Sequence, residues 1–150
     1  MKVRRKAQLL RVDLAEAESS LLAGLLEDFV TMLGNPDRSD PAFQRLYPDG
    51  YRDDDEAAKE YREMVEHDLS TQRIERVRTC QAELPDGDGR IGLDGEAADR
   101  WLRVLNDLRL TLGTRLGVTE ESELDESDPA VNIYHWLSAV QELLVDNLMA

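Results

Sequence analysis

The stretch of sequence that decides the fold is Asp94–Gly117, DGEAADRWLRVLNDLRLTLGTRLG. Its bulky apolar residues recur at steps of three and four, which places them on one face of an α-helix; they are Trp101, Leu105, Leu108, Leu112 and Leu116. Asp94 is a suitable N-cap, and Gly117 suits the left-handed conformation that commonly ends a helix. Because each buried side chain of this size contributes about 1.5–3 kcal/mol, we expect this helix to be the central packing element.

Similar apolar spacing outside this stretch predicts further helices. The expected ranges are 13–33, 41–46, 53–69, 70–84 and 129–148. Asp13 and Glu16 form a capping pattern at the first of these, and Asp128 caps the last. Residues 55–84 form either one helix or two, and we favour two with a break near Ser70. The pattern predicts a mainly α, compact single-domain bundle of about five to seven helices over residues 1–150.

Two short segments are candidate strands. Residues 8–12 and 90–93 are brief apolar runs that each precede a capping Asp and a helix. They leave open a small two-stranded β-ribbon, which would have to pack on the helices to be stable. The residues before them are basic, and we expect residues 1–6 to form a flexible arm. Its cations are the candidate nucleic-acid contacts; they are Lys2, Arg4, Arg5 and Lys6.

The charge balance argues against non-specific nucleic-acid binding. The chain has 32 acidic residues against 18 Lys and Arg, a net charge of −14, whereas phosphate contacts need clustered cations. The sequence has no apolar run long enough to span a membrane, about 18 residues, and its N-terminus lacks the apolar core of a signal peptide. A single cysteine, Cys80, excludes a disulfide within the chain and fits a reducing compartment. We expect a cytoplasmic protein.

No motif nominates an enzyme. The sequence has no P-loop, dinucleotide-binding glycine pattern, nucleophile elbow or H-E-x-x-H zinc motif. Asp86–Gly89 resembles part of a calcium loop, but aligning its last glycine with the invariant loop glycine leaves the first and last ligand positions without oxygen ligands. Glu63 and His67 are four residues apart, yet the other histidine and the cysteine lack metal-site spacing. We expect no catalytic residue, no cofactor and no metal.

Cys80 has two interpretations. It continues the helical spacing of Ile74 and Val77, which favours a buried cysteine that acts as a small hydrophobic residue. Neighbouring arginines would instead lower the pKa of an exposed thiol and make Cys80 a candidate redox thiol. These arginines are also candidates for DNA contact, and they are Arg73, Arg76 and Arg78.

Polar residues interrupt the apolar central helix. The candidate partner contacts there are Arg103, Asn106, Asp107, Arg109 and Arg115. Arg103 and Asp107 are four residues apart and are expected to pair. An ordinary solvated helix face is the alternative to a recognition surface. Gly113 costs about 1 kcal/mol relative to alanine inside a helix, so we expect another backbone to approach it closely.

Three segments resemble a known actinobacterial family. They are WLRVLNDLRLTLGTRLGVTEESE (101–123), RLYPDGYRDDDEAAKEYRE (45–63) and YHWLSAVQELLVDNL (134–148). The family was long described only as a domain of unknown function, its gene often neighbours that of the Clp-protease adaptor, and its members are now named oxidative-stress regulator AosR. The resemblance covers nearly the whole chain, from about residue 8 onwards.

The resemblance implies a redox-responsive transcriptional regulator that acts with an extracytoplasmic-function sigma factor and senses oxidant through a C-x-x-x-C pair. This chain departs from that pattern, because Arg76 and Leu84 occupy the positions four residues from Cys80. Either Cys80 acts through another chain or a sulfenate, or this member keeps the fold and partner without the thiol switch. We expect a non-enzymatic regulator that contacts a sigma factor or RNA polymerase, whose DNA-gripping surfaces are basic.

Other functions stay open. Direct DNA binding would use the basic segment Lys2–Arg11 or the arginines near Cys80, although the net charge opposes it. A proteolysis-linked adaptor or a small enzyme is supported only by the gene neighbourhood that the resemblance implies, and another structural interaction domain is a further alternative. Several helices are apolar over more than a third of their circumference, so a homodimer is a further alternative.

Overall fold

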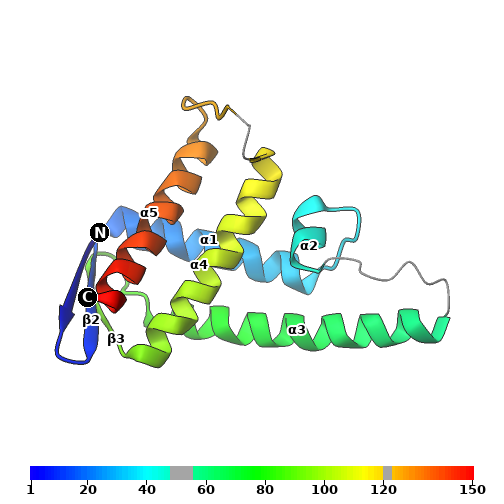
Figure 1. The fold of residues 1–150 in the computed structure, drawn as a ribbon, viewed down its shortest axis with the longest axis horizontal. Helices are drawn as coiled ribbons and strands as arrows, with labels where there is room; N and C mark the ends of the chain where they lie inside the picture. Colours follow the sequence, from blue (N-terminus) through cyan, green and yellow to red (C-terminus); the bar gives the residue numbers. More distant parts are fainter. Residues whose placement is uncertain (48–55, 120–122) are drawn as a thin grey trace.

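The described chain places a small sheet beside a set of helices. The computed structural model describes residues 1–47, 56–119 and 123–150. In order, its elements are the strands β1 (Lys2–Lys6) and β2 (Leu9–Leu14), the helices α1 (Glu16–Gly34), α2 (Pro41–Leu46) and α3 (Glu56–Glu83), the strand β3 (Gly89–Leu93), and the helices α4 (Gly95–Leu116) and α5 (Pro129–Met149). The prediction of a mainly α single domain is confirmed, with five helices in the described residues (Figure 1).

Helix α4 is the central packing element, as its sequence predicts. It packs against each of the other four described helices and against β3. The Asp94 side chain accepts a hydrogen bond from the Ala97 amide at 2.8 Å, so the predicted N-cap is present. Gly117 takes the left-handed conformation with φ of 70° and ends the helix. Both boundaries of this helix therefore follow from local sequence signals.

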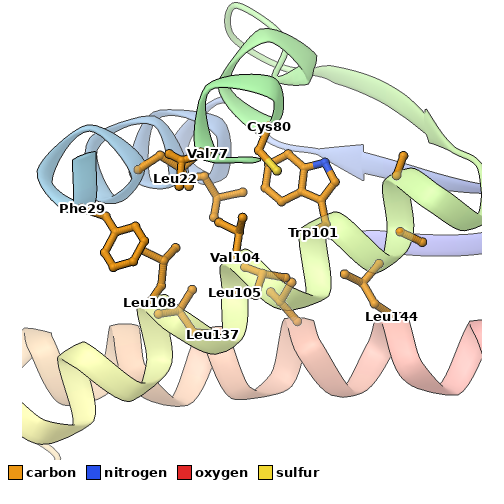
Figure 2. Packing of buried hydrophobic residues seen from close by; sticks show 14 of the residues in the cluster. Leu22, Phe29, Val77, Cys80, Trp101, Val104, Leu105, Leu108, Leu137 and Leu144 are labelled. Carbon is orange, nitrogen blue, oxygen red and sulfur yellow. The ribbon is translucent and has the colours of Figure 1, made fainter. Parts of the chain in front are cut away.

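The apolar face of α4 forms the middle of the core. Trp101, Leu105 and Leu108 are buried, as expected, and Figure 2 shows them among side chains from α1, α3 and α5. Val104 is also buried, whereas Leu112 and Leu116 near the C-terminal end of α4 are only partly buried. The core is therefore centred on the first four turns of α4.

The sheet has three strands rather than two. Strands β2 and β3 pair antiparallel, which confirms the predicted ribbon, and β1 pairs antiparallel with the other side of β2. The expectation of a flexible arm over residues 1–6 is wrong, because Lys2–Lys6 form β1. Apolar residues alternate along β2, and Leu10, Val12 and Leu14 bury one face of the sheet against the helices.

The first helix begins later than predicted. Asp13 is not its N-cap, because Asp13 lies in β2 and pairs with Arg90 of β3 at 2.6 Å. Helix α1 begins at Glu16, after Ala15, and the Glu18 carboxylate accepts a hydrogen bond from the Ala15 amide at 2.9 Å. Asp13 therefore takes part in strand pairing with β3, 77 residues further along the chain at Arg90, instead of capping α1 as the D-x-x-E pattern predicts.

Helix α3 is continuous, so the favoured break near Ser70 is wrong. Ser70 is buried, and its hydroxyl shares a hydrogen bond of 2.6 Å with the Tyr47 hydroxyl. The C-terminal half of α3 contributes Val77 and Cys80 to the core, whereas its N-terminal half extends past the core at the end of the molecule opposite the sheet (Figure 1). The predicted start of this helix at residue 53 lies outside the described residues.

Two further expectations concern close packing and membranes. An aromatic side chain, not a backbone, approaches Gly113 of α4: a Cβ there would lie 3.1 Å from the Tyr134 ring of α5. Among the described residues, no helix is both long and apolar enough to cross a membrane.

Candidate functional site

The most distinctive surface is an exposed apolar face on the N-terminal half of α3. Tyr61 and Met64 have exposed fractions of 68% and 63%, and Val65 and Leu69 are also exposed. Their spacing of three and four residues puts them on one side of the helix. Their spacing is visible in the sequence, but periodicity alone does not tell whether this face packs inside the molecule. We call these four residues the α3 face.

The α3 face is surrounded by negative charge. Residues 56–69 contain five acids against one lysine and one arginine. Glu60 and Asp68 are exposed and lie four residues before and four residues after Met64, so they flank the apolar strip. An apolar strip with acids beside it suits a partner that offers apolar residues flanked by cations, because desolvated apolar contact gives affinity and charge complementarity gives orientation.

A groove of about 420 Å³ lies on the opposite side of the same half of α3. It separates α3 from the end of α1, the following loop and α2, and its apolar lining includes Leu33, Phe43 and Ile74. Arg38 pairs with Glu66 across the rim. Glu63 and His67 also line the groove, but the described residues contain no group of three His, Cys, Asp or Glu side chains that would hold a metal.

Cys80 points into the core from α3 and is fully buried, with an exposed fraction of 0% (Figure 2). Burial is the main cause that raises the pKa of its thiol from the ordinary 9.0 to about 12; the nearby Glu83 carboxylate acts in the same direction, and Arg100 opposes both. Of the two interpretations, the structure therefore supports the small hydrophobic residue and not the exposed redox thiol, because oxidation requires an accessible thiolate.

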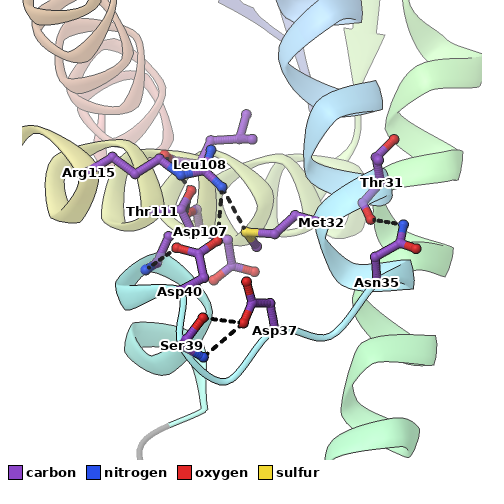
Figure 3. Close-up of polar contacts among 11 residues, drawn as sticks. Thr31, Met32, Asn35, Asp37, Ser39, Asp40, Asp107, Leu108, Thr111 and Arg115 are labelled. Atoms are coloured by element: carbon purple, nitrogen blue, oxygen red, sulfur yellow. Dashed lines mark hydrogen bonds and ion pairs between the residues drawn. The ribbon is translucent and has the colours of Figure 1, made fainter.

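The polar residues of α4 do not form one recognition surface. Arg103 pairs with Asp99 at 2.9 Å, so the expected pair with Asp107 is wrong. Asp107 instead pairs with Arg73 of α3 at 3.3 Å; burial raises the pKa of this carboxyl, and Arg73 opposes that effect. Arg115 reaches Asp40 at 3.4 Å and the sulfur of Met32 at the same distance (Figure 3).

Asp107 and Arg115 therefore connect α4 to its neighbours instead of facing a partner. Asn106 and Arg109 are only partly exposed. Arg109 lines a separate pocket of about 170 Å³ with Arg45 and Tyr134. The five α4 residues chosen from the sequence are thus spread around the helix.

The arginines near Cys80 are also engaged within the molecule. Arg73 lies 4.8 Å from the centre of the Tyr47 ring, in addition to its pair with Asp107. Arg78 pairs with Glu27 of α1 at 2.9 Å. These contacts join α3 to α1, α2 and α4, so they account for Arg73 and Arg78 without a nucleic acid. Arg76 attracts the Asp107 carboxylate and so opposes the rise in the pKa of that carboxyl.

The basic N-terminal residues lie on two sides of β1. Cross-strand pairing and alternation put Lys2, Arg4 and Lys6 on the outward face of the sheet. Arg5 points the other way and donates hydrogen bonds to the Leu148 and Ala150 carbonyls at the end of α5. Arg5 therefore fixes a helix end rather than contacting a ligand.

Sequence reasoning placed Arg11 in the basic N-terminal segment but missed another cation on that outward face, Arg90. Arg11 of β2 lies directly opposite Arg4, and Arg90 of β3 lies beside Asp13. Hydrogen bonding to Arg90 holds the pKa of Asp13 below its ordinary value; burial opposes this, and Arg90, Arg4 and Lys2 contribute attraction. Residues 2–6, KVRRK, contain one apolar residue, Val3, so no period-two alternation marked this strand, and Lys has low β-propensity.

Comparisons with known proteins identify the family. A family model described as "Domain of unknown function (DUF2017)" matches residues 1–148. The chain belongs to this family. A DUF2017 relative from Mycobacterium tuberculosis, named "Oxidative stress regulator AosR", is 31% identical over 178 aligned positions that cover 93% of this chain and 82% of the relative.

A second relative, from Mycobacterium leprae, is named "Putative oxidative stress regulator AosR" and is 33% identical over 138 aligned positions. The alignment covers 78% of this chain and 63% of the relative, so the chain matches less than two thirds of that protein. No solved structure matches the chain. The resemblance to the oxidative-stress regulator family is therefore confirmed, and the structural features of this DUF2017 chain have to be interpreted on their own.

Proposed function

We propose that this DUF2017 protein is a non-enzymatic cytoplasmic regulator of the oxidative-stress response that acts by binding a protein of the transcription machinery, a sigma factor or RNA polymerase. The names of its relatives support the regulatory role. The observation that carries the proposal is the α3 face, an exposed apolar strip beside acidic residues. Sigma factors and RNA polymerase present basic surfaces to DNA, and an acidic binder complements such surfaces.

The buried thiol shapes the proposed mechanism. With Cys80 inside the core and no second cysteine in the chain, an oxidant has no accessible thiol to modify. The proposed regulator therefore binds its partner in the same way in reduced and oxidised surroundings. The oxidative signal enters through the partner or through the amount of this protein.

Exposed apolar side chains on one helix turn make efficient binding residues. Tyr61 is the strongest anchor candidate, because aromatic residues are enriched among interface residues that carry most binding energy. Met64 adapts its shape to a partner surface. Tyr61 and Met64 are three residues apart on α3, so both side chains can contact the same partner surface.

The proposal is tested by measuring binding to purified RNA polymerase core and to purified alternative sigma factors from the same organism. The face variant carries Tyr61→Ser and Met64→Ser. Its matched control carries Leu143→Ser and Met149→Ser, which are exposed apolar residues of α5. We expect wild type and control to bind one of these proteins with equal affinity and the face variant to bind at least tenfold more weakly.

Two results would overturn the proposal. Wild type that binds neither polymerase nor any sigma factor removes the proposed partner class, and binding to a Clp-protease component in the same assay supports an adaptor instead. Equal binding by the face variant and wild type removes the α3 face from the mechanism. Circular dichroism of both variants establishes that helix content is unchanged.

A further inference from the structure

The outward face of the sheet is strongly basic on an acidic protein. Alternation along the three strands places five cations and a single acid on this face; the cations are Lys2, Arg4, Lys6, Arg11 and Arg90, and the acid is Asp13. The face therefore carries a net charge of +4. Because the net charge of the whole chain is −14, the rest of the chain carries −18. We call these five cations the basic sheet face.

The arrangement within the basic sheet face is costly to the fold. Arg4 and Arg11 are direct cross-strand partners, and the next residue in that row is Gly92. Like charges directly opposite one another destabilise a sheet. Asp13, the acid on this face, is already paired with Arg90 at 2.6 Å. Among the described residues, no ion pair neutralises Arg4 or Arg11, so the row needs an anion from outside the chain.

Protection of sheet edges does not explain all of these cations. Charged residues on an edge strand discourage pairing with other chains, and this accounts for Lys2 and Lys6 on β1. Arg11, however, lies on β2, the central strand of the described sheet, where no edge is exposed. Edge protection therefore does not explain the outward guanidinium of Arg11, and binding of an anionic ligand would explain it.

The spacing of the free cations suits a row of phosphates. Alternate residues of a strand are about 6.8 Å apart and neighbouring strands about 4.8 Å, so Lys2, Arg4, Lys6 and Arg11 form a flat grid of single positive charges. No aromatic side chain lies among the outward residues of the three described strands, so the face has nothing on which unpaired bases would stack. The grid thus fits a backbone rather than bases.

We propose that the basic sheet face binds the phosphate backbone of double-stranded DNA without reading its sequence. The acidic remainder of the surface repels DNA, so contact is confined to this face. At physiological salt the repulsion is screened beyond about 8 Å, so acidic residues farther away do not prevent that contact. The inference goes beyond the proposed protein contact, because the sheet lies at the opposite end of the molecule from the α3 face (Figure 1).

The test is fluorescence anisotropy with a labelled 20-base-pair duplex across a salt series. Four free cations predict a slope of log K against log salt of about −3.6, and hence about a hundredfold loss of affinity from 50 to 200 mM salt. The variant Arg4→Gln with Arg11→Gln lowers the slope to about −1.8. A control, Arg45→Gln with Lys59→Gln, removes the same charge from exposed positions on α2 and α3 and keeps the wild-type slope.

Folding is monitored by thermal melting. Because the first variant relieves the repulsion between Arg4 and Arg11, it melts at the wild-type temperature or above, so weaker DNA binding is not a consequence of unfolding. The proposal is wrong if wild type does not bind the duplex at 50 mM salt, or if the control loses affinity to the same extent. Equal or tighter binding of poly-glutamate would assign the face to an acidic protein instead.

Discussion

At the scale of single residues, the Cys80 thiol shows how burial governs chemistry. Burial raises the pKa of this thiol from the ordinary 9.0 to about 12, so at pH 8 far less of it is thiolate than in a free cysteine. We expect no reaction of the native protein with a disulfide reagent at pH 8 over minutes and one full equivalent of reaction in denaturing urea. If native protein rapidly released one equivalent of the reagent's thiol leaving group, the exposed-thiol interpretation would be restored.

The same pKa makes a prediction about alkaline stability. Since the folded protein holds the Cys80 proton up to about pH 12 and the unfolded chain releases it near pH 9.0, the thiol favours the folded state less and less as the pH rises through this window. Cys80→Ala removes this contribution. Urea unfolding between pH 8 and pH 10.5 should therefore show a steeper loss of stability for wild type than for the variant. Parallel pH profiles would contradict the buried-thiol account.

Two glycines offer a matched comparison of helix propensity and packing. Gly24 in α1 has open space where a Cβ would lie, whereas a Cβ at Gly113 would meet the Tyr134 ring at 3.1 Å. Replacing a mid-helix glycine by alanine contributes about 1 kcal/mol. We expect Gly24→Ala to stabilise the protein by nearly that amount and Gly113→Ala to stabilise it less or to destabilise it. The urea midpoints of the two variants measure the difference, and equal gains would show that the ring moves freely.

At the scale of elements, the sequence predicted helix boundaries that depend only on neighbouring residues. Asp94 and Asp128 cap α4 and α5, and Pro41 starts α2, because each effect involves neighbouring residues. Non-local pairing was not predictable in the same way. Residues Lys2–Lys6 have little intrinsic preference for a strand, and they form β1 because β2 offers an unpaired edge. Likewise, no local signal tells that one face of α3 lies outside the core.

The two halves of α3 should differ in local stability. The C-terminal half is fixed by buried Val77 and Cys80, but the turns around Tyr61 and Met64 present their apolar side chains to solvent. Short helical segments without tertiary packing are marginal in water. Hydrogen exchange should therefore be faster for amides of residues 58–68 than for residues 72–82. Uniform protection that increases with protein concentration would indicate that a second copy covers the α3 face.

At the scale of the whole molecule, the distribution of charge divides the protein into two ends. The sheet end carries the basic sheet face, and the far end of α3 carries an apolar strip among acids (Figure 1). The sequence places Lys2, Arg4, Lys6 and Arg11 in one basic segment, but the expected arm is wrong, because these residues lie in β1 and β2. Sequence reasoning missed Arg90, since only the strand register reveals that it shares a face with them.

This division predicts that the two proposed surfaces act independently. Sites that are far apart and share no partners have additive effects, so Arg4→Gln with Arg11→Gln should weaken DNA binding and leave affinity for the protein partner unchanged. Tyr61→Ser with Met64→Ser should do the reverse. Anisotropy and partner-binding titrations of both variants test each half of this prediction. When the partner is itself bound to DNA, wild type should bind the complex more tightly than either component alone, because the second contact becomes intramolecular. A variant at one end that weakened both interactions would instead show that DNA and the partner share a single surface.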